Sequence, residues 1–145
     1  MSALPCAGAV TERVFTPAEA NSALPEVREA AERLVALRRR MRALDDEQRT
    51  AVTAIGGNGV GYAAGDLNAA QGELRELAAE VAACVEELTE LGVEVKDLDA
   101  GLVDFPAVRG GERVLLCWRV GEDEVAWWHG LEDGFAGRRR IDWSE

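Results

Sequence analysis

Several residue types are scarce in this chain of 145 residues, and each scarcity excludes a class of protein. The three cysteines are widely separated and form no Cys-x-x-Cys pair, so neither a disulfide framework nor a zinc knuckle is indicated. No apolar run reaches the roughly 18 residues of a membrane span. Residues 1–13 lack the basic start and long apolar run of a signal peptide. We therefore expect a protein of the reducing cytoplasm without a membrane partner.

Basic residues are also scarce relative to acidic ones. The chain has 16 lysines and arginines against 27 aspartates and glutamates, which gives a formal net charge of -11. Phosphate backbones and anionic membrane surfaces repel so acidic a chain. Nucleic acid is therefore not expected as a partner, and the short basic runs at 38–40 and 138–140 are interpreted as solvated faces or ion-pair partners.

A long heptad pattern is the strongest feature that the sequence does contain. Apolar residues recur at alternating spacings of three and four over 67–91, which is the seam of a coiled coil. A second seam of the same kind covers 27–55 and leads into a glycine-rich stretch. That stretch lacks the Gly-Lys-Ser/Thr ending of a phosphate-binding loop. Two such helices with a short tip between them predict an antiparallel hairpin.

A capping box marks the start of the first helix. Thr16 suits the N-cap, Pro17 suits the first helical position, and Glu19 completes the box. Pro25 disfavours helical geometry at the residue before it. We therefore predict a short helix at 17–23 and a restart or kink at Pro25.

Charged flanks of the two seams select a register for the hairpin. In an antiparallel coiled coil, g positions of one helix face g positions of the other. Pairing Arg40 with Glu80 and Arg33 with Glu87 gives two contacts between opposite charges. We predict this register, although exposed pairs stabilise a protein by only about 0.2–1 kcal/mol each.

After the second helix the period changes to that of strands. Strand-like runs occupy 93–96, 101–106 with a closing proline, 113–120 and 124–129. The fold class predicted is α+β, with a long antiparallel coiled-coil helical hairpin at 25–91 and a small antiparallel β-sheet at its open end. The sheet belongs to a β subdomain at 92–145. We expect a flexible tail at 1–13 and a single domain at 14–145.

Several short motifs occur together as a set. They are Phe15-Thr16 with Glu19-Ala20-Asn21, Gly101-Leu102-Val103-Asp104-Phe105-Pro106, Leu116-Cys117-Trp118 with Gly121-Glu122, Trp128-His129, and Gly134-Phe135 with Gly137-Arg138. In these motifs the chain resembles the bacterial "domain of unknown function 2203" family over roughly 14–142. That family has no established activity. The resemblance implies a compact bacterial protein with a helical arm, and it marks the motif members Asp104, Glu122, His129 and Arg138.

His129 is the only histidine and the centre of the candidate site. A carboxylate pair with a histidine suits a divalent metal, so the candidate metal ligands are Asp104, Glu122 and His129. Histidine beside a carboxylate also suits general acid–base catalysis. Arg138 and Trp118 complete the ligand-binding candidates. A purely structural interpretation stays open, with the carboxylates in turns or caps and Arg138 tying the tail to one of them.

The place of Cys117 depends on the turn between the last two strands. A two-residue turn pairs Leu116 with His129, puts His129 on the face of Trp118 and leaves Cys117 on the other face. A three-residue loop or a bulge reverses this. We interpret Cys117 as a buried structural residue, with a Cys–His nucleophile as the alternative.

Two functions fit these features. The first is a non-enzymatic interaction or regulatory protein, since a projecting hairpin presents surface and encloses little. The alternative is a protein that binds a small ligand or divalent metal around His129, with hydrolysis as its catalytic form. No cofactor other than that metal is predicted. The expected partner is another protein, or a second copy of the chain that forms a homodimer through the hairpin.

Overall fold

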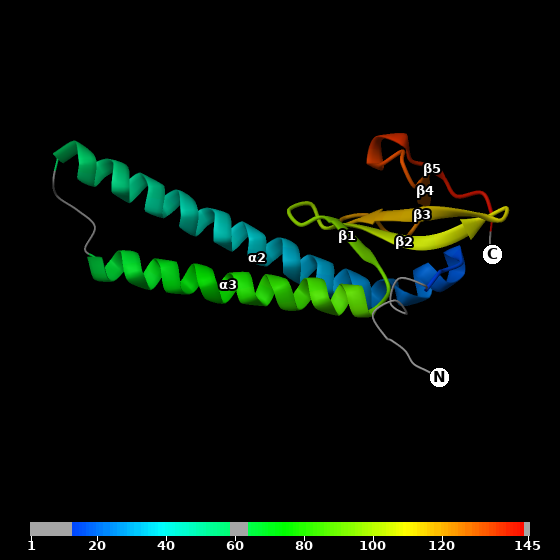
Figure 1. The fold of residues 1–145 in the computed structure, drawn as a ribbon, viewed down its shortest axis with the longest axis horizontal. Coiled ribbons are helices and arrows are strands. Elements are labelled where there is room, and N and C mark those ends of the chain that lie inside the picture. The colour runs from blue at the N-terminus through cyan, green and yellow to red at the C-terminus, as the bar shows by residue number, and fades with distance from the viewer. Residues whose placement is uncertain (1–12, 59–63, 144–145) are drawn as a thin grey trace.

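The computed structural model describes residues 13–58 and 64–143 (Figure 1). Within them the elements are α2 (Pro17–Asn58), α3 (Ala64–Glu90), β1 (Glu94–Asp97), β2 (Leu102–Arg109), β3 (Glu112–Arg119), β4 (Trp127–Gly130), the 3-10 helix η1 (Phe135–Gly137) and β5 (Arg139–Arg140). The two helices form an elongated hairpin, and the sheet lies at its open end. The predicted α+β fold is therefore confirmed. None of the described helices is both long and apolar enough to cross a membrane.

The predicted capping box is present at the start of α2. Thr16 N donates to Glu19 Oε1 and Glu19 N donates to Thr16 Oγ1, both at 3.0 Å. The predicted break at Pro25 is wrong, because α2 continues through it. Pro25 is exposed, whereas Leu24 and Val27 are buried in the main core. Packing on this core outweighs the one backbone hydrogen bond that a proline removes from a helix interior.

The two predicted ion pairs of the hairpin do not form, because both arginines have other partners. Arg40 Nη2 lies 3.0 Å from Glu73 Oε2, and Arg33 Nη2 lies 3.7 Å from Glu80 Oε1. The predicted partners were Glu80 and Glu87. Each observed partner precedes the predicted one by seven residues, so it lies on the same flank of α3, and such exposed pairs are too weak to select one partner.

The sheet is an antiparallel meander in the order β1-β2-β3-β4-β5. The predicted end of the second strand at Pro106 is wrong, because β2 continues to Arg109. The Pro106 carbonyl accepts a hydrogen bond from Phe15 N at 2.7 Å. The N and O atoms of one strand residue point to the same side, so Pro106 turns its missing N–H toward the Phe15 segment. The ladder between β2 and β3 therefore loses no hydrogen bond.

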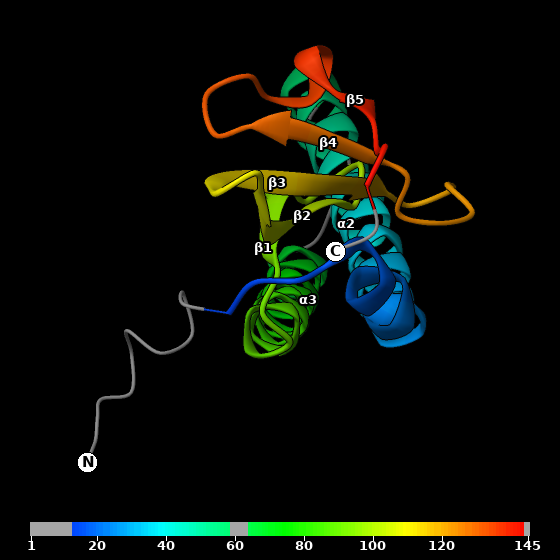
Figure 2. The same cartoon turned by 90° about the vertical axis from the view of Figure 1, so that its right-hand side faces the viewer.

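The hydrophobic core fills the space between the hairpin's open end and one face of the sheet. Figure 2 views this end and shows α2 and α3 side by side below the strands. The sheet contributes the alternate residues Val103, Phe105, Ala107, Val114, Leu116 and Trp118, and the helices contribute residues such as Leu24, Val27, Ala31, Leu34 and Leu88. Phe15 closes one edge of this core, with its ring 5.1 Å from that of Phe105 in an edge-to-face contact.

Gly101, between β1 and β2, lets the sheet approach the hairpin closely. Its φ is +69°, a left-handed conformation that favours glycine. A Cβ atom there would lie 2.4 Å from Val120 Cγ2 and 2.8 Å from Val35 Cγ2. Both the backbone conformation and the space therefore require glycine at this junction.

Candidate metal centre

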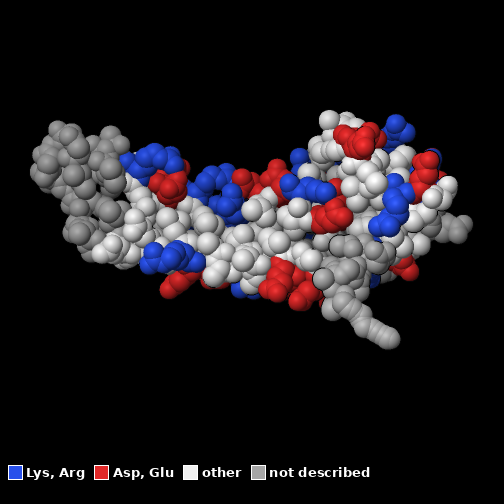
Figure 3. Space-filling view, in the orientation of Figure 1, with Lys and Arg blue, Asp and Glu red and all other residues white. Residues whose placement is uncertain are grey.

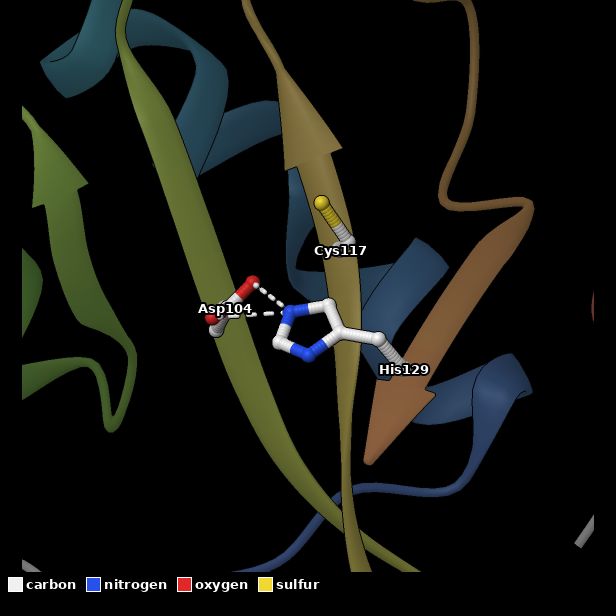
Figure 4. A group of neighbouring side chains, drawn as sticks. All are labelled: Asp104, Cys117 and His129. Carbon is white, nitrogen blue, oxygen red and sulfur yellow. Dashed lines mark hydrogen bonds and ion pairs between the residues drawn. The ribbon is translucent and has the colours of Figure 1, made fainter. Parts of the chain in front are cut away.

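The sheet face that points away from the helices carries a buried polar cluster. The register places Asp104 of β2 opposite Cys117 of β3, and Cys117 opposite Trp127 of β4. His129 follows Trp127 by two residues and therefore projects from the same face. Figure 4 shows the three side chains Asp104, Cys117 and His129 together in front of the sheet, with α2 behind it.

This register corrects the prediction for the last two strands. Leu116 pairs with Trp128, whereas the two-residue turn predicted His129. The connection between β3 and β4 covers 120–126, so it is longer than that turn. A shift of one residue turns every side chain of a strand to the other face. His129 therefore shares a face with Cys117 and lies opposite the face of Trp118.

Asn21 of α2 holds this long connection in place. Its Oδ1 accepts a hydrogen bond from Val125 N at 2.8 Å, and its Nδ2 donates to Val125 O at 3.2 Å. Both backbone groups of Val125 are thus bound to a helix that lies far away in the sequence. The helix therefore fixes the path of the loop, and the loop fixes the face on which His129 lies.

His129 and Asp104 form a buried pair whose side chains are 5% and 2% exposed. His129 Nε2 lies 3.2 Å from Asp104 Oδ2 and 3.3 Å from Oδ1. His129 Nδ1 lies 2.7 Å from the carbonyl oxygen of Gly130. A carbonyl oxygen can only accept, so Nδ1 carries a proton and donates it. This hydrogen bond aims Nε2 at the Asp104 carboxyl group.

Burial is the main electrostatic influence on the cluster. It raises the pKa of Asp104, and the nearby His129 opposes this increase. Burial also raises the pKa of the Cys117 thiol to about 11, with a further increase from Asp104 and an opposing effect of Arg138. Both groups therefore lack enough positive charge around them to favour their anionic forms. A bound cation would supply that charge.

The cluster offers three kinds of metal ligand in one place. A carboxylate oxygen of Asp104, the sulfur of Cys117 and a ring nitrogen of His129 all lie within 4.8 Å of one another. Metal–ligand distances of about 2.0–2.3 Å put the ligand atoms of tetrahedral zinc roughly 3.3–3.8 Å apart. The separation of His129 Nε2 from Asp104 nearly meets this requirement already. No other group of three such side chains comes this close among the residues that the structure describes.

Arg138 borders the cluster on the side of Cys117. Its Nη1 lies 3.6 Å from Cys117 Sγ, and its Nη2 is paired with the Glu122 carboxylate. The guanidinium group lies 4.6 Å from the ring centre of Trp127 and 4.4 Å from that of Phe135. These contacts leave its side chain only 13% exposed. Arg138 is thus held in a fixed place beside the thiol.

The candidate residues predicted from the sequence lie in different places in the structure. Asp104 and His129 belong to the group of three, while Arg138 and its partner Glu122 border it. Trp118 lies on the opposite face, fully buried in the core, where its Nε1 donates to the carbonyl of Glu122 at 3.0 Å. Sequence reasoning missed Cys117 as a member. The two-residue period of β3 had already put Cys117 on the face opposite Trp118, but the assumed turn placed His129 on the other side of the sheet.

Comparison with known proteins gives one match. The model of a family described as "Uncharacterized conserved protein (DUF2203)" matches residues 13–141. No curated protein and no solved structure matches significantly. The matched range contains the hairpin, the sheet and all three members of the buried cluster. The chain therefore belongs to this family of uncharacterised conserved proteins.

Proposed function

We propose that this protein binds a divalent transition-metal ion through Asp104, Cys117 and His129. The observation that carries the proposal is the convergence of a carboxyl, a thiol and an imidazole from three neighbouring strands into one buried place. A buried polar group costs free energy unless its partners compensate for the lost water. A buried ionisable pair does not by itself imply a gain in folding stability, because apolar residues of similar volume in its place often stabilise a fold equally well. Binding of a metal ion would explain why these three polar side chains are buried together.

The hydrogen bond of His129 Nδ1 supports this role. Histidine ligands commonly donate the proton of their other ring nitrogen to a carbonyl or carboxylate, which fixes the tautomer and the ring orientation. The carbonyl of Gly130 accepts that bond here, at 2.7 Å. Nε2 is thereby left as the ligating atom, and it already faces Asp104. Metal binding would replace the contact between Nε2 and the Asp104 carboxyl group with two metal bonds.

The ligand types select the class of metal. A thiolate with an imidazole and one carboxylate favours zinc and similar ions over magnesium or calcium, which prefer oxygen ligands alone. All three residues are buried. Such burial favours holding an ion over processing a substrate that would have to reach it. The proposed function is therefore non-enzymatic, with the metal as a clamp that joins β2, β3 and β4.

Metal analysis of the untagged protein tests this proposal. We expect one zinc or cobalt ion per chain, and a sulfur-to-cobalt charge-transfer band that identifies Cys117 as a ligand. Cys117→Ser and His129→Gln should each weaken binding at least tenfold. Cys84→Ser is the matched control, because Cys84 is also a buried cysteine but lies in the hairpin. Absence of metal binding in the wild type, or equal loss in the Cys84 variant, would refute the proposal.

A further inference from the structure

One flank of the hairpin is covered by the sheet at its open end and is bare farther toward the tip. The loop between β1 and β2 marks the boundary, where Asp99 Oδ1 lies 2.8 Å from Arg38 Nε and 3.0 Å from Arg42 Nη2. Beyond this loop lies a groove of about 470 Å³, of which both arginines are part. Its apolar lining comes from Met41 of α2 and from Leu74 and Ala78 of α3.

The groove exposes part of the seam that elsewhere forms the core. Met41 packs against the main core and is partly exposed, Leu74 is partly exposed, and Ala78 is exposed. A hairpin is only two helices thick, so each flank of its seam needs a cover. Two hairpins commonly supply that cover for each other in a four-helix arrangement. Methionine suits such a contact because its side chain adapts to irregular surfaces.

The charges around the groove are complementary to those of the same groove in a second copy rotated by 180°. Arg38, Met41, Arg42 and Asp45 follow one another at spacings that share one face of α2. A two-fold axis between Met41 and Arg42 brings Arg38 of one copy opposite Asp45 of the other. The same symmetry generates the reciprocal pair, because a two-fold contact uses one patch on both copies. Two ion pairs would then flank a centre where Met41 of each copy lies opposite Arg42 of the other.

The charge of the whole chain favours the same place. Copies with a net charge of -11 repel each other, so they can approach best where acidic residues do not dominate. The groove is lined by Arg38, Arg42 and Arg75 and by one acid, Asp45. Asp99 pairs with Arg38 and Arg42 at its edge, so acidic residues do not dominate there. Figure 3 shows basic side chains interspersed with acidic ones along the hairpin.

We infer that this groove is an interface between two copies of the chain, packed as an antiparallel, two-fold symmetric pair of hairpins. This inference is independent of the metal site, which lies on the far face of the sheet. The groove lining spans only about two turns of α2 and one turn of α3, so we expect the contact to bury less than the roughly 1,600 Å² of a standard stable interface. The dimer is therefore reversible and dissociates on dilution.

Sedimentation velocity over a range of concentrations tests the inference. The wild type should change from monomer to dimer as its concentration rises, and Met41→Asp should stay monomeric. Ala79→Asp is the control, because Ala79 is exposed next to the groove residue Ala78 but turned outward on α3. Far-UV circular dichroism establishes that each variant remains folded. A wild type that stays monomeric, or a Met41→Asp variant that still forms dimers, would overturn the inference.

A charge exchange tests the predicted register itself. Arg38→Asp and Asp45→Arg should each lose the dimer, because like charges then face each other at both ends of the contact. An equal mixture of the two variants should form a heterodimer, since every opposing pair is again of opposite charge. A mixture that remains monomeric would show that these residues do not face each other across a two-fold axis.

Discussion

Replacing Leu88 with alanine should strongly destabilise the fold. Leu88 is fully buried, at 0% exposure, in the cluster that joins the hairpin to the sheet. Leucine-to-alanine changes in cores cost about 2–5 kcal/mol, and the cost rises with the volume of the cavity that remains. The cluster contains residues from both the helices and the sheet, so we expect that the site does not easily collapse. We expect a loss of about 3–5 kcal/mol, a large part of the roughly 5–15 kcal/mol that stabilises a typical domain.

Leu74→Ala is the matched comparison, because Leu74 occupies the same seam but lines the open groove. A partly exposed leucine loses less burial, so about 1–2 kcal/mol is expected in the monomer. Urea unfolding of both variants in dilute solution measures the two losses, and Leu88→Ala should also lower the melting temperature by roughly 10 °C. Equal losses for the two variants would refute the argument that the core is concentrated at the hairpin's open end.

Two further substitutions test the metal-free site and the junction between sheet and hairpin. Burial raises the pKa of Asp104, so its contribution to stability is full below the unfolded value of about 4 and is lost as pH rises through the higher folded value. Asp104→Asn should therefore gain stability relative to the wild type as pH rises from about 4, in urea unfolding with a metal chelator present; a relative loss would contradict this. Gly101→Ala should lower the free energy of unfolding by more than Gly110→Ala, because both glycines have positive φ but only at Gly101 would an added Cβ atom lie within 3 Å of other side chains. Equal losses would mean that backbone conformation alone accounts for the effect.

The fold was largely predictable because its two halves have different periods. A heptad seam can bury itself only against another helix, and the alternating runs after it can form only strands. The errors arose where a tertiary interaction outweighed a local sequence preference. Pro25 disfavours a helix locally, yet burial of Leu24 and Val27 keeps α2 continuous. The partners of Arg33 and Arg40 were assigned from exposed charges, which are too weak to select one pairing.

The candidate site was predictable only in part. Asp104 and His129 were found through their motifs, and the structure places them in contact. The two-residue turn put His129 on the wrong face, away from Cys117, because that assignment needed the length of one loop. The loop is held by Asn21 and Val125, which are 104 residues apart in the sequence. No local sequence pattern predicts a contact over that distance. A shift of one residue in strand register, however, changes which side chains lie on the same face.

The same contact has a consequence for how the chain folds. The meander pairs only successive strands, and α2 pairs with the next helix, so most of the structure can form from nearby segments. Low contact order of this kind favours rapid folding. The half of α2 that packs on the sheet is the exception, since Asn21 leaves the ribosome about 100 residues before Val125, its hydrogen-bonding partner. The hairpin can therefore assemble during synthesis, while docking of its open end onto the sheet must wait until the last strands have emerged.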